Sequence, residues 1–332
     1  MSERGSPAFD GDSLDRPTAS ASRSDPGDEA GNADRVDDDT VGDDAVAAAD
    51  LDLRDPGDER ERVRSFLASS VAAAGADGVV VNMSGGLDST VTAALAVEAL
   101  GADRVYGLIL PCNKVGAPHA RDAEALADAL GIDHDTVHLH SLFAQLGAVA
   151  PDRFDLHDEP VLSGNAVARL RMTLAYLAAN ATNRLVCGTA NRSELLLGYF
   201  TKHGDGGADL HPIGHLYKTE VRALAAELDV PEFVVEKPPT AGFLPGQRDA
   251  DDLGASYEVI DRVLRLGVDR GLDAETITDR LSGDGGSGDE EGSDSAGERV
   301  DVDGQTVADL LARHRTTAHK RATPRVPTGR GR

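Results

Sequence analysis

The sequence contains no tryptophan and only 2 cysteines among its 332 residues. Cys112 and Cys187 lie far apart and form no CxxC pair, which argues against a disulfide framework or a cysteine-based metal site. Because each ends an apolar, strand-like run, we expect two buried free thiols. No apolar run is long enough to span a bilayer, and the acidic, polar N-terminus does not resemble a signal peptide. We therefore predict a soluble cytoplasmic protein that does not bind a membrane.

Lysine is also scarce, occurring only at positions 114, 202, 218, 237 and 320. Lysine and arginine together number 33 against 58 acidic residues, which gives a formal net charge of −25. This balance argues against a nucleic-acid-binding protein, whose surface carries a basic stripe. A strongly anionic, lysine-poor surface suits high salt, where its self-repulsion is screened. We predict a salt-adapted protein that binds no nucleic acid, the alternative being an ordinary acidic protein with a disordered tail.

The most informative motif is the run Ser84-Gly85-Gly86-Leu87-Asp88-Ser89-Thr90. It follows the apolar stretch 78–83 and precedes an alanine-rich helical pattern, so it is predicted to link a strand to a helix. Two glycines allow a sharp turn close to a bound group, and a helix N-terminus offers N–H donors to an anion. The motif therefore predicts a polyphosphate site with a carboxylate for Mg²⁺, although an ordinary capped turn is the alternative.

Two familiar nucleotide loops are excluded, because no Lys-Ser or Lys-Thr follows the glycines and no GxGxxG spacing is present. The pattern SGGxDS instead resembles the pyrophosphate loop of the N-type ATP pyrophosphatases. Those enzymes cleave ATP between its α and β phosphates and transfer AMP to an acceptor.

Strand and helix patterns alternate through the middle of the chain. Such alternation predicts an α/β fold with a doubly wound, mostly parallel sheet, whose ligands bind at the carboxyl ends of the strands. The predicted strands are 79–83, 105–110, 136–139 and 184–187, and the predicted helices are 58–71, 89–100, 119–130, 164–179, 193–197, 218–228 and 254–266.

Composition changes mark the segments outside this pattern. Residues 1–58 are acidic and poor in large apolar side chains, so we predict a disordered extension. Residues 282–298, SGDGGSGDEEGSDSAGE, are predicted to form a flexible acidic insertion between a domain at 59–281 and a segment at 299–332. From Arg313 to Arg332 there are seven arginines or lysines and no acid. This basic tail is either a solvated end or a segment recruited to an anionic ligand.

A second strand-to-helix turn, residues 189–194, follows the strand predicted at 184–187. Carboxylates on neighbouring strand ends can hold a metal across phosphates, so Glu194 is a candidate Mg²⁺ ligand beside Asp88. Helix capping by Asn191 or Ser193 is the alternative for this turn. Downstream, the glycine-rich stretch 198–209 predicts a loop, and Lys218 begins an amphipathic helix.

The order and spacing of these motifs resemble ammonia-dependent NAD synthetase. The resemblance covers roughly residues 60–325, including GTANRSELLLGYFTKHGDGGADLHPIGHLYKTEV at 188–221, NAVARLRM at 165–172 and His319-Lys320-Arg321. It implies a homodimer of Rossmann-like or flavodoxin-like subunits, as in the adenine-nucleotide α-hydrolase-like group, with 59–281 as the catalytic domain and 299–332 completing the site. It implies Mg²⁺ on Asp88 and Glu194, and ATP contacts from Asn82, Met83, Ser84, Gly85, Gly86, Leu87, Asp88, Ser89, Thr189, Lys218 and Thr240.

The same resemblance implies that Arg169, Lys202, Asp209, His319 and Lys320 bind deamido-NAD. Arg169 and Arg171 are two residues apart on one predicted helix, so both are not expected to face one ligand, and Arg169 is preferred.

The implied reaction is the ATP-dependent amidation of deamido-NAD by ammonia, through an adenylated carboxylate, with release of AMP and pyrophosphate. Catalysis is assigned to Asp88 and Lys218, and Asp205 is the candidate proton acceptor, the alternative being a solvated loop carboxylate. No stretch resembles a glutamine-hydrolysing domain, so free ammonia is the predicted nitrogen source. Two other interpretations are a related pyrophosphatase that adenylates a nucleotide or a tRNA base, and a non-catalytic adenine-nucleotide-binding module.

Overall fold

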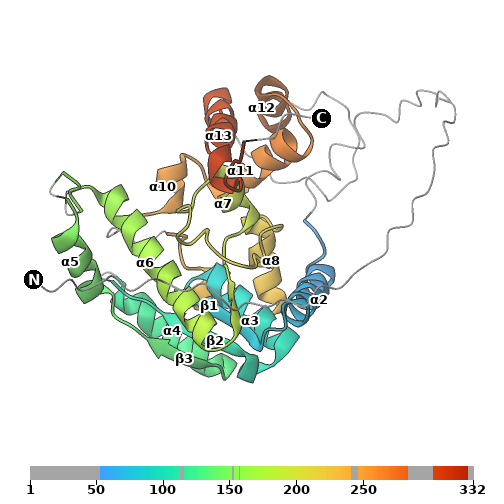
Figure 1. The fold of residues 1–332 in the computed structure, drawn as a ribbon. Helices are drawn as coiled ribbons and strands as arrows, with labels where there is room; N and C mark the ends of the chain where they lie inside the picture. Colours follow the sequence, from blue (N-terminus) through green and yellow to red (C-terminus); the bar gives the residue numbers. More distant parts are fainter. Residues whose placement is uncertain are drawn as a thin grey trace, which may run out of the picture. The chain divides into compact units, whose positions relative to one another are not determined.

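Figure 1 shows the computed structural model. It describes residues 53–112, 116–151, 153–156, 158–240, 246–282 and 302–327. Most of the predicted acidic extension and nearly all of the predicted insertion lie outside these residues.

Four parallel strands form one sheet in the order β3-β2-β1-β4. They are β1 (Gly78–Asn82), β2 (Val105–Ile109), β3 (Asp133–Thr136) and β4 (Arg184–Cys187). The predicted α/β fold with a parallel sheet is confirmed.

The third strand lies three residues before its predicted position at 136–139. Its last regular pair joins Thr136 to Ile109, the final residue of β2. Beyond that pair the neighbouring chain reaches Pro111, which has no N–H to donate, so the regular ladder ends. Val137 and Leu139 still donate to the carbonyls of Ile109 and Pro111, both at 2.8 Å.

Alternating side chains of β1 enter two different hydrophobic cores, as the pleat of a strand requires. Val79 and Val81 belong to a core that includes buried residues of five helices, and Val80 belongs to a core that includes buried residues of a sixth. The first five helices are α2 (Pro56–Ala74), α3 (Leu87–Leu100), α4 (Ala117–Leu130), α8 (Lys218–Glu227) and α9 (Glu232–Val235). The sixth is α6 (Pro160–Ala181), beside which α5 (His140–Val149) packs. The sheet is therefore covered by helices on both faces, as predicted.

The chain reverses its direction of travel across the sheet next to β1. From β1 it proceeds outward to β2 and β3, and then it returns through α6 to β4 on the other side of β1. The turns that follow β1 and β4 therefore lie at neighbouring strand ends, at a topological switch point where open α/β sheets bind ligands.

A separate hydrophobic core joins helices from the second half of the chain, among them α7, α11, α12 and α13. Gly254, the first residue of the helix predicted at 254–266, instead ends the preceding helix at φ 80°, so the helix begins at Tyr257. The remaining elements are η1 (Ala102–Arg104), α7 (Arg192–Leu197), α10 (Asp249–Leu253), α11 (Tyr257–Leu264), the π-helical turn η2 (Arg265–Asp269), α12 (Ala274–Ser282), α13 (Gly304–Thr316) and α14 (Ala318–Arg321).

Both cysteines are free thiols, but only one is fully buried. Burial raises the pKa of Cys187 to about 12, so it is an inert core residue. Cys112 is half-buried, which corrects the expectation of two buried thiols, and its partial burial also raises its pKa. Among the residues that the structure describes, no helix has the length and apolar character needed to cross a membrane.

Substitution of Gly78 by alanine tests the close packing at the start of β1. A Cβ added there lies 1.9 Å from the carbonyl oxygen of Arg104, whereas a Cβ at Gly75 meets nothing within 4 Å. Overpacking of this kind costs about 1–3 kcal/mol, and Gly75→Ala meets only the cost of its φ of 62°, about 1–2 kcal/mol. We expect Gly78→Ala to lower the free energy of unfolding by the larger amount in denaturant titrations. Equal losses in the two variants contradict this packing.

Candidate active site

A cavity of about 300 Å³ opens at the carboxyl ends of the strands. Its walls include residues from both strand-to-helix turns and from segments far along the chain. Among the predicted site residues it brings together Asn82, Met83, Ser84, Gly86, Leu87, Asp88, Ser89, Thr189, Glu194, Asp205, Lys218 and Thr240.

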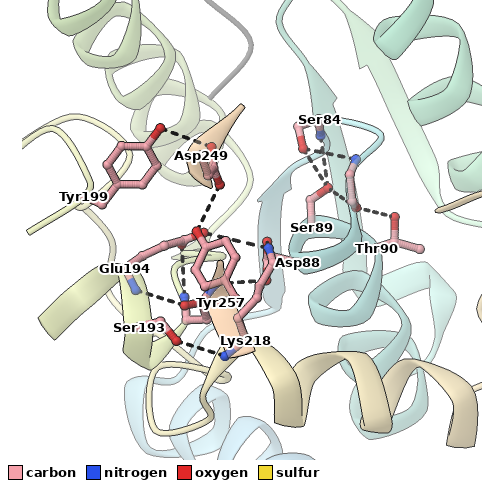
Figure 2. A network of polar contacts seen from close by, with 12 residues as sticks. Ser84, Asp88, Ser89, Thr90, Ser193, Glu194, Tyr199, Lys218, Asp249 and Tyr257 are labelled. Carbon is pink, nitrogen blue, oxygen red and sulfur yellow. Dashed lines mark hydrogen bonds and ion pairs between the residues drawn. The ribbon is translucent and has the colours of Figure 1, made fainter. Parts of the chain in front are cut away.

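The turn after β1 is held by its own serines. The Ser89 hydroxyl donates to the Gly86 carbonyl at 3.1 Å and accepts from the Ser84 amide at 3.2 Å (Figure 2). Gly85 has φ 73°, and a Cβ added there lies 2.4 Å from the carbonyl oxygen of His119, so only glycine suits this position. The turn has one well-defined shape because these contacts fix it at both ends.

Helix α3 begins after Gly86 without a side-chain cap, which contradicts the alternative of an ordinary capped turn. A glycine cap leaves the first N–H groups of the helix to a ligand, and the helix dipole favours an anion there. Leu87 and Asp88, the first two helical residues, line the cavity. The turn therefore has the properties of a phosphate site.

A buried lysine lies between two of the predicted carboxylates. The Lys218 ammonium donates to the Asp88 carboxylate and lies 3.9 Å from Oε1 of Glu194. Asn191 steadies Asp88 from the other side by donating to its Oδ1 at 3.1 Å. Asp88 and Glu194, predicted from separate turns, thus face the same ammonium in one cavity wall (Figure 2).

Glu194 takes part in the helix cap that the sequence offered as the alternative, and one of its oxygens also faces Lys218. Its Oε2 accepts from the Asn191 amide at 3.3 Å, and Asn191 Oδ1 accepts from the Glu194 amide at 3.0 Å, so the pair forms a helix cap. Its other oxygen faces Lys218. Burial and the negative charge of Asp88 hold the pKa of Glu194 well above its usual value, against the opposite effect of Lys218. Burial alone lowers the pKa of Lys218, but Asp88 and Glu194 outweigh it and raise that pKa.

Asp249 adds a third carboxylate that sequence reasoning missed. It accepts hydrogen bonds from the hydroxyls of Tyr257 at 2.9 Å and Tyr199 at 3.1 Å, and it lines the same cavity. Burial raises its pKa, while the two tyrosines and Lys218 oppose that rise. Three acidic side chains thus lie close enough to one ammonium to raise its pKa, and a bound cation would favour the charged form of all three.

The donor set fits a magnesium ion that is shared with a substrate. Within the described parts of the chain, no group of three or more His, Cys, Asp or Glu side chains is arranged to hold a metal by itself. Mg²⁺ commonly takes one or two protein carboxylates and completes its shell with phosphate oxygens and water. Asp88 and Glu194 supply oxygens of this kind next to the phosphate turn.

Buried Asp261 positions the helix that carries Lys218. Its Oδ1 accepts from the Ser193 hydroxyl at 2.5 Å, and its Oδ2 accepts from the Thr219 amide at 2.9 Å. The Ser193 oxygen in turn accepts from the Lys218 amide at 3.0 Å. Two amides at the start of α8 are therefore satisfied through one carboxylate, which fixes the backbone beneath the lysine.

Asp205 is an exposed residue that also lines the cavity. Its Oδ1 accepts from the Thr201 amide at 2.9 Å, which braces its own loop. Desolvation by the surrounding protein raises the pKa of Asp205, against the lowering effects of the Thr201 amide and Arg171.

Arg171, not Arg169, faces the main cavity. The Nε of Arg171 donates to the Leu110 carbonyl at 3.1 Å, and the side chain forms part of the cavity wall. Arg169 lies exposed on the surface of α6, where its Nε donates to the Lys202 carbonyl at 3.3 Å.

Four of the five predicted dinucleotide-binding residues gather on a surface outside the cavity lining. Lys202 donates to the carbonyls of His319 at 2.6 Å and Ala322 at 3.2 Å, which ties the glycine-rich loop to α14. Lys320 donates to the carbonyls of Gly198 and Phe200, both at 2.8 Å. These contacts bring together a cationic surface made of four residues, which are Arg169, Lys202, His319 and Lys320.

Asp209 is engaged elsewhere. It accepts from the Val186 amide at 2.8 Å and from the Tyr176 hydroxyl at 3.1 Å, so it braces the loop against β4 and α6.

Comparisons with known proteins give one consistent answer. A sequence model of the NAD synthase family matches residues 59–284. An NH(3)-dependent NAD(+) synthetase of Methanosarcina mazei is 41% identical over 269 residues, which cover 81% of this chain and 96% of that protein. The protein of the same name from Halobacterium salinarum (strain R1) is 40% identical over 281 residues, 83% of this chain and 97% of that one.

Solved structures agree with the sequence comparisons. NMN synthetase from Francisella tularensis has 31% identity and a TM-score of 0.67, covering 83% of this chain and 100% of its own. NH3-dependent NAD synthetase from Campylobacter jejuni, in complex with nitrate, has 27% identity and a TM-score of 0.65 with the same coverage.

The pH dependence of stability tests the burial of Asp261. Desolvation raises its pKa to about 6 from 3.8, so the folded state binds this proton more tightly than the unfolded state does. The contribution of Asp261 to stability is therefore full below pH 4, falls as the pH rises to 6 and is constant above that. One pKa unit corresponds to about 1.4 kcal/mol, so the fall amounts to about 3 kcal/mol.

Asp261→Asn removes this dependence. We expect the difference in free energy of unfolding, variant minus unmodified protein, to increase by about that amount between pH 4 and pH 6.5. The altered hydrogen bonds lower the stability of the variant by a further amount that does not change with pH. Urea titrations at several pH values measure the difference, and exposed Asp103→Asn is the control. A difference that does not change with pH contradicts the raised pKa.

Proposed function

Because this chain belongs to the NAD synthase family, we propose that it amidates deamido-NAD with ammonia, using ATP and releasing NAD, AMP and pyrophosphate. The observation that carries the proposal is the Lys218 ammonium held between Asp88 and Glu194 beside the phosphate turn. The matched region covers 96% and 97% of the two relatives named NH(3)-dependent NAD(+) synthetase, so the proposal draws on nearly the full length of each of those proteins.

The reaction must replace a carboxylate oxygen by nitrogen. Hydroxide is a poor leaving group, and a carboxylate anion repels nucleophiles, so direct attack by ammonia is slow. In the proposed first step a carboxylate oxygen attacks the α phosphorus of ATP, and the bond from that phosphorus to the bridging oxygen breaks as pyrophosphate departs. Ammonia then attacks the carbonyl carbon, AMP leaves with its oxygen, and the nitrogen gives up a proton.

We assign charge neutralisation to residues of the cavity. The N–H groups at the start of α3 bind phosphate oxygens, and Thr189 and Thr240, which line the cavity, contact ATP. Lys218, which is paired with Asp88, adds its ammonium to the polyphosphate. Preorganised donors of this kind are most effective when charge develops on the leaving group. Mg²⁺ held by Asp88 and Glu194 supplies further neutralisation of the phosphate charge when it is bound.

Asp205 is the proposed proton acceptor for ammonium. Desolvation by the surrounding protein raises its pKa, which makes it a stronger base, and the Thr201 amide and Arg171 limit the rise. The neighbouring cationic surface of Arg169, Lys202, His319 and Lys320 is proposed to bind the anionic dinucleotide, and Asp209 contributes by bracing its loop.

We further propose a cytoplasmic homodimer, built through an exposed apolar face of α5 and α6. Leu162 and Leu177 are exposed on α6, as are Leu142 and Val149 on α5. The helical repeat places Leu162, Arg169 and Leu177 on one face of α6. A second copy packed there covers these side chains and lies next to the proposed dinucleotide surface.

The principal test measures products and variants together. Incubation with ATP, Mg²⁺, ammonium and deamido-NAD should give NAD and AMP in equal amounts by mass spectrometry, while glutamine in place of ammonium gives little NAD. Asp88→Ala should abolish the product with the fold intact, and Glu194→Gln should reduce turnover by about a hundredfold. Exposed Glu61→Gln on α2 is the control. Near-normal turnover by Asp88→Ala contradicts the proposal.

A mononucleotide acceptor is the second candidate, because the Francisella tularensis neighbour is an NMN synthetase. The same assay therefore includes nicotinic acid mononucleotide. A higher kcat/KM for the mononucleotide than for deamido-NAD identifies the smaller acceptor as the substrate.

The dimer is tested at α6. The double variant Leu162→Glu and Leu177→Glu introduces charges into the proposed interface, so we expect it to sediment as a monomer in analytical ultracentrifugation. Phe66→Glu places the same charge at an exposed apolar residue of α2 and should remain dimeric. A double variant that stays dimeric places the interface elsewhere.

A further inference from the structure

The peptide bond between Gly85 and Gly86, in the turn that follows β1, has a hydrogen-bond partner at each end. The Gly85 carbonyl accepts from the Lys237 ammonium at 2.9 Å, and the amide of the same peptide, on Gly86, donates to the Ser84 hydroxyl at 3.3 Å. Gly85 sits in the left-handed region at φ 73°. Rotation of this peptide breaks both contacts, so Lys237 helps to decide which way the turn faces.

Lys237 is itself fixed by an acid on α4. Its ammonium donates to Asp122 Oδ2 at 2.6 Å, and the two side chains are 20% and 36% exposed. The same helix presses the His119 carbonyl against Gly85, where a Cβ would come within 2.4 Å. Helix α4 therefore contacts the turn twice, directly through its backbone and indirectly through the Asp122–Lys237 pair.

Lys237 also connects the turn to another segment that lines the cavity. It is followed by Pro238 and Pro239, whose fixed φ angles and restriction of the preceding residue make this a stiff segment. Thr240 comes next, and residues 237–240 all line the cavity. Burial, together with the positive charge of Lys237, lowers the pKa of His119 nearby.

We propose that Lys237 is a positioning residue for the polyphosphate of ATP, acting through the Gly85–Gly86 peptide and dependent on Asp122. It orients the turn so that the N–H groups at the start of α3 face the β and γ phosphates. This inference rests on the proposed function for the identity of the nucleotide.

Calorimetric binding of two nucleotides tests the inference without any turnover. The probes are α,β-methylene-ATP with Mg²⁺, which cannot be cleaved at the relevant bond, and AMP, which lacks the β and γ phosphates. Loss of a hydrogen bond to a charged group is typically worth a factor of ten or more. We expect Lys237→Met to weaken α,β-methylene-ATP by about tenfold or more and AMP by less than about twofold.

Asp122→Asn separates positioning from direct charge attraction. If Lys237 acts through the turn, loss of its partner loosens it, and α,β-methylene-ATP binds about threefold or more weakly. If Lys237 only attracts phosphate, removal of the competing carboxylate leaves binding unchanged or tighter, and the proposal is overturned. Arg121→Met removes an exposed charge from the adjacent residue of α4 and should leave both affinities unchanged.

Three further outcomes are decisive. Equal weakening of AMP and the ATP analogue by Lys237→Met, or by Lys237→Gln if the first variant does not fold, shows general damage to the cavity and overturns the proposal. A protein that makes no NAD but shows the expected binding pattern supports the role of Lys237 while it refutes the proposed acceptor. Wild-type protein that does not bind the analogue refutes both.

Discussion

The site depends on one buried ammonium placed between carboxylates from different helices. Lys218 is the first residue of α8, Asp88 belongs to the first turn of α3, and Glu194 to the first turn of α7. An unpaired lysine at this depth would be neutral, and the carboxylates without it would repel one another. Each charge is therefore stable only because the others are present. The same contact joins three helices at the edge of the sheet where the two strand-to-helix turns meet.

Three of the helices that begin at this edge, α3, α7 and α8, meet around Lys218, and of these three only α3 is left open to a ligand. Helix α7 is capped by Asn191, and the first amides of α8 are satisfied by Ser193 and Asp261. Helix α3 has a glycine cap without a side-chain partner. The chain thus uses its polar side chains to close two helix starts and uses glycine to keep the third free for phosphate. A protein of net charge −25 can therefore still offer a favourable site to a polyanion. The electrostatic potential at the turn is set mainly by the nearby N–H groups and Lys218, and less by the charge of the whole protein.

Local sequence patterns were enough to predict the sheet and the two turns, because β-branched residues favour strands and glycines allow tight turns wherever they occur in the chain. It also paired Asp88 with Glu194, since parallel strand ends meet at one edge. It failed where a distant residue decides the outcome. Pro111 on the neighbouring strand ends β3, and α4 and the segment after α9 bring Asp122 and Lys237 together at Gly85. Spacing on α6 could not tell which arginine faces the cavity, because that depends on how the helix lies on the sheet. The scarcity of lysine was the available signal for Lys237, one of five in the chain.

Burial also separates the ion pairs that salt can weaken from those it cannot. At about 1 M salt the screening length is roughly 3 Å, so exposed pairs contribute little there. Arg64 and Glu61 on α2 are such a pair, with side chains 41% and 67% exposed. The side chains of Lys218, Asp88 and Glu194 are 4%, 18% and 17% exposed, and all three line the cavity. A surface with so many carboxylates can therefore depend on salt for its solubility while the functional charges remain paired. In the proposed reaction the cavity gives a polyphosphate access to Lys218, where it competes with Asp88 for the lysine.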